Sequence, residues 1–215
     1  MKAKILDLET KLSLAEIEKF IEDAGSDDLP VFGGTYQGGI HVQQIPDEIA
    51  PCILAILETK EKIASYFEIG VAAGGTTFLF NHFFDLKQIV LLDDNKHPEA
   101  GLRADILKDI KYTEVIGNSH DEESVAKVAD FEPFDIILID GDHSYAGVKL
   151  DVTLFLPYLR PGGFLILHDS IRPEFDVQKA VKELKADERM EFIDEYISKK
   201  HSSPCGIALF KKVIS

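Results

Sequence analysis

The feature that most constrains the fold is a regular alternation of two kinds of segment after residue 65. Five strand-like runs occupy residues 66–70, 88–93, 112–117, 134–140 and 163–169. Segments able to form helices follow them at 76–84, 99–109, 121–129, 145–159 and 177–184. Strands that alternate with helices predict a parallel sheet with right-handed crossovers. Because the strands are apolar on both faces, we expect helices to cover each side of the sheet.

The C-terminal end breaks this alternation. Strand-like runs at 190–198 and 206–214 are separated by about seven residues, too few for a crossover helix. They should therefore pair as an antiparallel hairpin. The predicted fold class is α/β, with a Rossmann-like, seven-stranded, mostly parallel sheet that ends in a C-terminal antiparallel hairpin and carries helices on both faces. A dinucleotide-binding fold would normally continue with parallel units instead.

The N-terminal region, residues 1–62, should form helices and a lid loop packed on the core formed by residues 63–215, the two making a single globular unit. Ser13 and Glu16 form a capping-box pattern that predicts a helix start. A second helix should begin near Pro46. Between them the loop at 31–46 is rich in glycine and polar residues, and we expect it to act as a lid.

Composition excludes some classes of function. The chain has 215 residues and a net charge of −15, and an acidic balance argues against nucleic-acid binding. No apolar run approaches the roughly 20 residues that cross a bilayer, so we expect no membrane partner. The cysteines, Cys52 and Cys205, are far apart, which favours a reducing cytoplasm and suggests neither a disulfide framework nor a zinc site.

The loop after the first of these strands has the composition of a ligand-binding turn. It carries the pattern E-x-G-x-x-x-G-G at Glu68, Gly70, Gly74 and Gly75, followed by Thr76 at a helix start. Glycines permit positive φ and close approach of a ligand to the backbone. In open α/β sheets, ligands bind outside the carboxyl ends of the strands. We therefore expect a ligand at this turn.

The ligand expected at this turn is a nucleoside without phosphates. Neither the G-x-G-x-x-G pattern nor the phosphate-binding G-x-x-x-x-G-K-[ST] loop is present, and no lysine or arginine lies near the turn. Asp93 and Asp94 end the second strand, where an acid commonly binds the hydroxyls of a ribose. A nucleoside that carries positive charge suits these acids, and S-adenosylmethionine is such a molecule.

Titratable groups follow the fourth and fifth strands. Asp140, Asp142 and His143 come directly after one buried strand, and His168 and Asp169 end the next. Neighbouring parallel strands present their carboxyl ends side by side, so Asp140 should lie beside His168 and Asp169. Carboxylates and an imidazole that converge at a cleft are credible ligands for a divalent ion. Asp142 is expected to face water.

Over residues 66–213 the sequence resembles the class I S-adenosylmethionine-dependent methyltransferases. The segments that carry the resemblance are FEIGVAAGGTT, VLLDDN, VIGNS, FDIILIDGDHSY and LRPGGFLILHDS. More narrowly, EIGVAAGGTT with DGDHSY and LHDS resembles the bacterial branch of macrocycle-tailoring sugar O-methyltransferases and cephalosporin-hydroxylase-like proteins. On this resemblance, residues 63–215 would form the S-adenosylmethionine-binding methyltransferase domain.

The resemblance implies a cofactor site. Glu68, Gly70 and Gly74 would frame the methionine end of S-adenosylmethionine. Either Asp93 or Asp94 would hold the ribose, and the residues do not decide between them. The remaining implied contacts are made by Gly75, Thr76, Asn118, Ser119 and Asp140, with Asn118 and Ser119 bordering the adenine.

The resemblance also implies the catalytic and metal-binding residues. His143 matches the general base of the sugar-methylating relatives, and a histidine suits this role because its pKa lies near neutrality. Asp140 is the other catalytic residue. Metal-dependent relatives imply a divalent ion, Mg or Mn, at Asp140, His168 and Asp169. An acid is usual at the position of His168, and an imidazole there suits softer metals than Mg.

We therefore expect an S-adenosylmethionine-dependent methyltransferase that modifies a hydroxyl on a small molecule or sugar. One alternative is a non-catalytic protein that binds S-adenosylmethionine or a partner on the same scaffold. The other is an NAD-linked oxidoreductase, which the glycine spacing and the terminal hairpin both disfavour. The amphipathic first helix leaves a homo-oligomer open, and the sequence does not identify the methyl acceptor.

Overall fold

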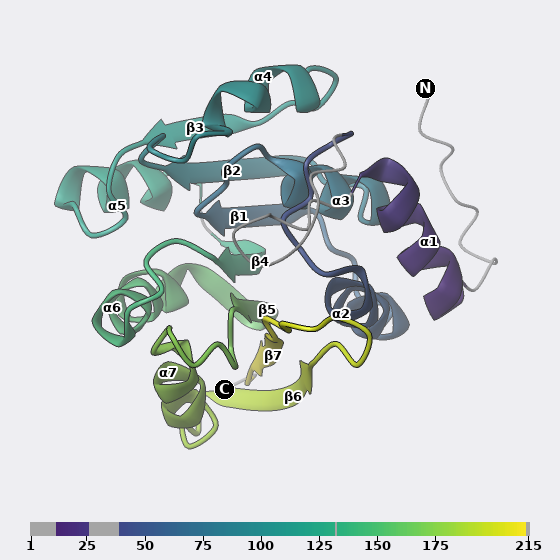
Figure 1. Cartoon of the computed structure of the whole chain (residues 1–215). Coiled ribbons are helices and arrows are strands. Elements are labelled where there is room, and N and C mark those ends of the chain that lie inside the picture. Colours follow the sequence, from purple (N-terminus) through teal and green to yellow (C-terminus); the bar gives the residue numbers. More distant parts are fainter. Residues whose placement is uncertain (1–11, 26–38, 132, 214–215) are drawn as a thin grey trace.

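The computed structural model describes residues 12–25, 39–131 and 133–213. Its centre is a seven-stranded sheet with the order β3-β2-β1-β4-β5-β7-β6 (Figure 1). Strands β1 to β5 are parallel, and β7 runs antiparallel to both β5 and β6, which confirms the predicted fold class. The strands are β1 (Ser65–Ile69), β2 (Gln88–Asp93), β3 (Thr113–Ile116), β4 (Phe134–Ile139), β5 (Leu159–His168), β6 (Met190–Tyr196) and β7 (Ile207–Lys212).

Helices cover both faces of the sheet (Figure 1). Alternate residues of each strand point to opposite faces, so Tyr66 and Phe67 of β1 belong to two different apolar clusters. One cluster receives side chains from α1 (Leu14–Ala24), α2 (Pro46–Glu58) and α3 (Gly75–Phe83). The other receives them from α5 (Glu122–Ala129), α6 (Tyr145–Phe155) and α7 (Val177–Leu184).

The first helix begins as the capping box predicts. The Ser13 hydroxyl accepts a hydrogen bond from the Glu16 backbone N–H, and the Glu16 carboxylate accepts one from the Ser13 N–H. Ile17 and Ile21 are completely buried in the cluster that contains α2 and the sheet. How the chain divides into a 1–62 region and a 63–215 domain remains a prediction.

Two predicted helices are shorter in the structure. The segment 99–109 forms a 3₁₀ turn, η2 (Ala100–Leu102), and the four-residue α4 (Arg103–Ile106). Gly101 lowers helix propensity there. The segment 145–159 ends as a helix at Phe155 and passes through the 3₁₀ turn η3 (Leu156–Tyr158), because β5 begins four residues earlier than predicted. A register shift between Phe134 and Ile136 accommodates this longer strand beside β4.

Only part of the predicted lid loop can be located, because residues 26–38 lie outside the described residues. The part from Gly39 to Ile45 packs directly on the start of α3. A Cβ added at Gly75 would lie 2.6 Å from the carbonyl oxygen of Ile40. Val42 in the same segment is completely buried. A role as a lid stays a prediction. Within the described residues, no helix has both the length and the apolar character needed to cross a membrane.

The turn after β1 depends on a glycine at position 70. Gly70 has φ +78°, and a Cβ there would lie 2.2 Å from the carbonyl oxygen of Asp140. The two loops that follow β1 and β4 are therefore in direct backbone contact, which a side chain at this position would prevent.

We expect Gly70→Ala to destabilise the fold by more than about 2 kcal/mol, because it combines a left-handed φ with a backbone clash. Urea unfolding followed by circular dichroism measures the change. Gly101→Ala is the matched control, since no atom lies within 4 Å of a Cβ added there. Equal stability of the two variants would contradict the assigned role of Gly70.

Candidate active site

A cavity of about 650 Å³ lies at the carboxyl ends of the parallel strands. Its walls come from the loops after β1 to β5, together with segments near residues 41–45 and 201–205. This volume is in the range of small-molecule and cofactor sites. The predicted site residues that line it are Glu68, Gly70, Gly75, Thr76, Asp93, Asp94, Asn118, Ser119, Asp140, His143, His168 and Asp169.

Gly74, unlike the other two glycines predicted to contact the cofactor, does not line the cavity. It caps the N-terminus of α3 with φ +87°, and a Cβ there would meet the side chains of Leu107 and Arg103. Gly74 therefore packs toward the α4 region. Gly70 and Gly75 are the glycines that border the cavity.

Glu68 is an almost completely buried acid at the base of the cavity. Burial disfavours the carboxylate and raises the pKa of Glu68 to about 8. The hydroxyls of Thr77 and Tyr66 both donate to its Oε2 and partly oppose that effect. Glu68 is therefore a largely neutral group at pH 7 that a nearby cation would help to ionise.

The two acids at the end of β2 differ in their surroundings. Asp93 is buried, and its oxygens accept hydrogen bonds from the backbone N–H groups of Val71, Ala72 and Asn95. Asp94 is exposed and pairs with Lys96 at 2.6 Å. Asp93 thus holds the glycine turn in place, whereas Asp94 contacts the backbone N–H and the ammonium group of Lys96. The choice between them for a ribose stays open.

No lysine or arginine is close in sequence to the glycine turn after β1, but the fold brings one arginine into contact with it. The guanidinium of Arg103 is buried and donates two hydrogen bonds to the Ala72 carbonyl. It also pairs with Asp93 at 3.1 Å and with Glu114. Arg103 is 31 residues from Ala72 in sequence, which is why the local pattern did not reveal it. Its charge is engaged by these two acids.

A buried acid that the sequence did not point to lies behind the cavity wall, in contact with the lining residue His120. Asp151 of α6 is completely buried, and its Oδ1 lies 3.2 Å from Nε2 of His120. Burial raises the pKa of Asp151 to about 6, and contacts with Ser119 and His120 oppose that effect. Asn118 and Ser119 line the cavity beside this pair. An acid on the apolar face of a helix, four residues before Phe155, was the available signal.

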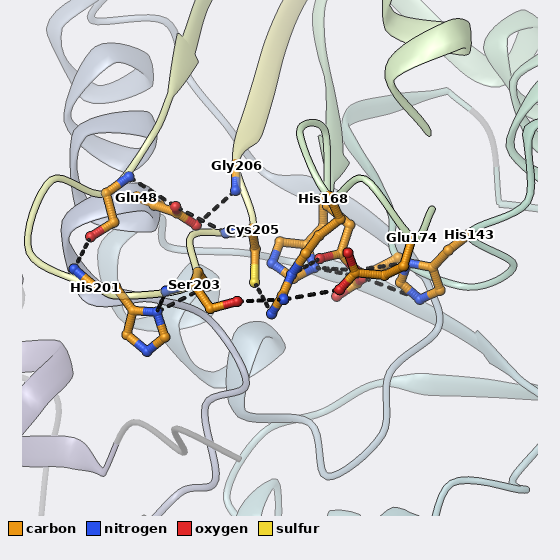
Figure 2. Close-up of polar contacts among 12 residues, drawn as sticks. Glu48, His143, His168, Glu174, His201, Ser203, Cys205 and Gly206 are labelled. Atoms are coloured by element: carbon orange, nitrogen blue, oxygen red, sulfur yellow. Dashed lines mark hydrogen bonds and ion pairs between the residues drawn. The ribbon is translucent and has the colours of Figure 1, made fainter. Parts of the chain in front are cut away.

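The acids and histidines after β4 and β5 converge as predicted from the parallel sheet. His168 Nδ1 lies 2.8 Å from Asp140 Oδ1, and His143 Nδ1 lies 2.8 Å from Asp169 Oδ2. Gln44 donates to the other Asp140 oxygen at 3.0 Å. Figure 2 shows His143 and His168 on the same side of the site. The two imidazoles are thus each held by a different carboxylate.

The charges in this cluster shift one another's pKa values. Burial disfavours the imidazolium of His143, but the hydrogen bond to Asp169 and the charge of Asp140 outweigh it and raise the pKa. Burial likewise opposes the charged form of His168, yet Asp140 and Asp169 raise its pKa well above the usual range. The pKa of Asp169 is lowered, because the attraction of His168 and His143 exceeds the cost of burial. Asp142 is exposed, as expected.

Two sets of potential metal ligands occur in this cluster. Ligand atoms of Asp140, His143 and Asp169 all lie within 4.8 Å of one another, and so do those of His168, Asp169 and Cys205. The three residues proposed from sequence, Asp140, His168 and Asp169, are adjacent but are divided between these sets. Cys205 was missed because it is 37 residues from His168 and has no cysteine or histidine spacing pattern around it.

Glu48 of α2 is a second feature that the sequence analysis missed. Its side chain is completely buried, and its carboxylate accepts hydrogen bonds from the backbone N–H groups of Ser198, Cys205 and Gly206 (Figure 2). Burial raises the pKa of Glu48, and these hydrogen bonds oppose the shift. Glu48 thereby fixes the loop that brings Cys205 to the cavity. Its position one turn before the buried Cys52 was the only local signal.

Replacing Glu68 with glutamine tests whether this acid is neutral in the folded state. The folded pKa is about 8 and the unfolded value is 4.5, so between these pH values only the folded state holds the proton. The contribution of Glu68 to stability is therefore fully present below pH 4.5 and is lost as pH rises to 8. We expect the stability of Glu68→Gln relative to the unsubstituted protein to increase over this window by at most about 1.4 kcal/mol per pH unit.

Urea unfolding at several pH values between 5 and 8.5 measures this difference, since glutamine does not titrate. Glu122→Gln, at an exposed position in α5, controls for the change in net charge. Parallel pH profiles for Glu68→Gln and the unsubstituted protein would show that Glu68 is ionised when folded.

Comparison with known proteins gives a consistent result. Residues 67–170 match a family model described as a methyltransferase domain. Demethylmacrocin O-methyltransferase from Streptomyces fradiae is 28% identical over 122 residues, covering 52% of this chain and 29% of the relative. The chain therefore spans less than a third of the length of that curated relative.

Solved structures share the fold. An O-methyltransferase from Bacillus cereus, solved with S-adenosylhomocysteine, has a TM-score of 0.60 at 15% identity and covers 93% of this chain and 90% of its own. The MycE methyltransferase, solved with Mg, S-adenosylhomocysteine and mycinamycin VI, has a TM-score of 0.59 at 21% identity, covering 94% of this chain and 55% of its own. The matched residues, the strand order and the position of the cavity make this chain similar to the class I S-adenosylmethionine-dependent methyltransferases, whose fold it shares.

Proposed function

We propose that the protein transfers a methyl group from S-adenosylmethionine to a hydroxyl on a small molecule or sugar. The observation that carries the proposal is the position of the acid–histidine cluster. Asp140, His143 and Asp169 lie in the same cavity as the glycine turn at Gly70. Methyl transfer needs an activated donor and a proton acceptor in one site, and this cavity offers a place for each.

The residues of the cavity fit a cationic nucleoside. Gly70 borders this cavity, and its missing side chain lets the turn lie directly against the backbone of Asp140 and Gly141. Glu68 and Asp140 border the same space, and a sulfonium or amino group bound beside them would favour the ionised form of Glu68. Asn118 and Ser119 would border the adenine, with Gly75 and Thr76 near the turn. Asp93 or Asp94 would hold the ribose.

His143 is the proposed general base, with Asp169 as its orienting partner. The hydrogen bond between Nδ1 and Asp169 fixes the ring and leaves Nε2 free to accept a proton. Nε2 lies 4.0 Å from Asp140 Oδ1, so it faces the cluster. The ring of Phe175 packs against His143 at a centroid distance of 4.6 Å, which further limits its rotation. Holding the base in place contributes to alignment with the acceptor.

A divalent ion is compatible with the substrate side of this cluster. Asp140, His143 and Asp169 present nitrogen and oxygen atoms within 4.8 Å of one another, whereas His168 uses Nδ1 to contact Asp140. Asp140 and Asp169 would hold the ion on this side, with His168 as the third ligand proposed from sequence. When bound, an ion there would lower the pKa of the acceptor hydroxyl.

The relatives support hydroxyl acceptors as the substrate class. One is named for demethylmacrocin O-methylation, and a structural neighbour was solved with mycinamycin VI. The family match favours methyl transfer over a hydride-transfer reaction with NAD. We also propose that the protein is cytoplasmic and can form a homo-oligomer. Residues 63–215 would form the cofactor-binding domain, with residues 1–62 packed on it.

Nucleoside binding is the first test. We expect S-adenosylhomocysteine to release heat on titration into protein first stripped of co-purified nucleoside, with a Kd in the micromolar range, about −8 kcal/mol. NAD should give no binding heat. Isothermal titration calorimetry on folded protein makes the measurement. Binding of NAD in place of S-adenosylhomocysteine would overturn the proposed reaction.

Removal of the base is the second test. We expect His143→Gln to lower kcat by roughly 10²- to 10⁴-fold, the usual contribution of a positioned base. The affinity for S-adenosylhomocysteine should change little, because His143 lies at the acceptor side. Transfer of a labelled methyl group to a panel of hydroxylated sugars and catechols measures turnover.

His82→Gln is the matched control, since His82 stacks on Phe20 away from the cavity. Full turnover in His143→Gln would remove His143 as the base. Failure of the unsubstituted protein to methylate any panel member while binding S-adenosylmethionine would favour a non-catalytic binding protein.

A further inference from the structure

His168 has one ring nitrogen engaged and one without a partner. Nδ1 contacts Asp140 at 2.8 Å, while Nε2 is buried and has no hydrogen-bond partner among the described residues. The side chain is only 8% exposed. Leaving a buried polar atom without a partner costs roughly 1 to 3 kcal/mol, so such an atom needs an explanation.

His168 belongs to a compact group of residues with metal-ligating atoms. His168, Asp169 and Cys205 each offer one ligand atom, all three residues are buried, and the atoms lie within 4.8 Å of one another. In Figure 2 the Cys205 side chain lies between the Glu48 contacts and His168. Ligands around a zinc ion at 2.0 to 2.3 Å are separated by about 3.3 to 3.8 Å, so only a small contraction would close the set.

We propose that His168, Asp169 and Cys205 bind a divalent transition ion of the zinc class. The donor atoms are one imidazole nitrogen, one carboxylate oxygen and one thiolate sulfur. Such a set favours zinc or cobalt over magnesium, which prefers oxygen ligands. Three protein ligands with the fourth position toward the cavity is the arrangement of an accessible zinc site.

The hydrogen bond from His168 to Asp140 supports this assignment. Histidines that bind a metal through one nitrogen usually donate the other N–H to a carboxylate, which fixes the tautomer and the ring orientation. Here Asp140 takes that position at Nδ1, which leaves Nε2 as the nitrogen proposed to bind the ion. In this arrangement Asp140 positions His168 and does not bind the ion, so the set is an alternative to the Asp140, His168 and Asp169 ligands predicted from sequence.

Further contacts hold the thiol in position. Glu48 accepts a hydrogen bond from the Cys205 backbone N–H at 3.2 Å. The Arg172 guanidinium donates a hydrogen bond to Sγ at 3.3 Å and so limits the positions that the side chain can take. Asp169 lies between the two ligand sets, because its Oδ2 is 2.8 Å from His143 Nδ1 and 3.6 Å from His168 Nδ1.

The zinc-class site does not depend on methyl transfer, and its test uses the metal alone. Full-length protein is reduced, treated with a chelator, desalted and titrated with Co²⁺. We expect a thiolate-to-cobalt charge-transfer band in the near ultraviolet, displaced by Zn²⁺ and not produced by Mg²⁺. Competition with a chromophoric chelator then gives the Zn²⁺ affinity. Calorimetry with S-adenosylhomocysteine on the same samples tests nucleoside binding separately. Binding of S-adenosylhomocysteine without a Co²⁺ band would contradict the metal site alone and not the proposed function.

Cysteine variants identify the ligand. Cys205→Ser should lose the charge-transfer band and weaken Zn²⁺ binding by more than about 100-fold, since even outer-shell partners contribute roughly 10- to 100-fold. Cys52→Ala is the matched control, because Cys52 is buried in the α2 core, and it should keep both properties. His168→Gln, in which Cys205 is intact, should also lose Zn²⁺ affinity. This second variant tests the same site if Cys205→Ser does not fold.

Absence of the band in the unsubstituted protein would overturn the proposal. A band that persists in Cys205→Ser, or one that disappears in Cys52→Ala, would place the ion elsewhere and overturn it equally. Circular dichroism of each variant confirms that the comparison is made between folded proteins.

Discussion

The close contact between the turn after β1 and the turn after β4 is the constraint on which the rest of the site depends. Gly70 has no side chain, so its backbone lies directly against the Asp140 carbonyl. The parallel pairing of β1 with β4 brings these two turns to the same edge of the sheet. The cavity for a nucleoside and the acid–histidine cluster are therefore adjacent as a consequence of strand order.

Residues that are distant in the sequence hold the loops at the carboxyl edge of the sheet in place. Asp93 holds the backbone of the glycine turn, and Arg103 holds both Asp93 and the Ala72 carbonyl. On the other side, Glu48 of α2 holds the loop that carries Cys205. These are buried charges whose partners are backbone groups or opposite charges, so removing one partner leaves the other unsatisfied.

Sequence reasoning predicted the features that follow from local pattern and strand order. The alternating strands, the terminal hairpin and the meeting of Asp140 with His168 and Asp169 all follow from the parallel sheet and the short final connection. It did not predict Glu48, Arg103 or Cys205, because each acts on a segment far away in the chain. Such contacts depend on how helices and loops pack around the sheet, which hydrophobic periodicity does not specify.

A structure of the protein crystallised with S-adenosylhomocysteine is the most direct test of the central claim. We expect density for the amino-acid end of the ligand beside Gly70 and Glu68. The sulfur should face Asp140 and His143, and the adenine should lie near Asn118 and Ser119. Ligand density elsewhere on the molecule, with this cavity filled only by solvent, would contradict it.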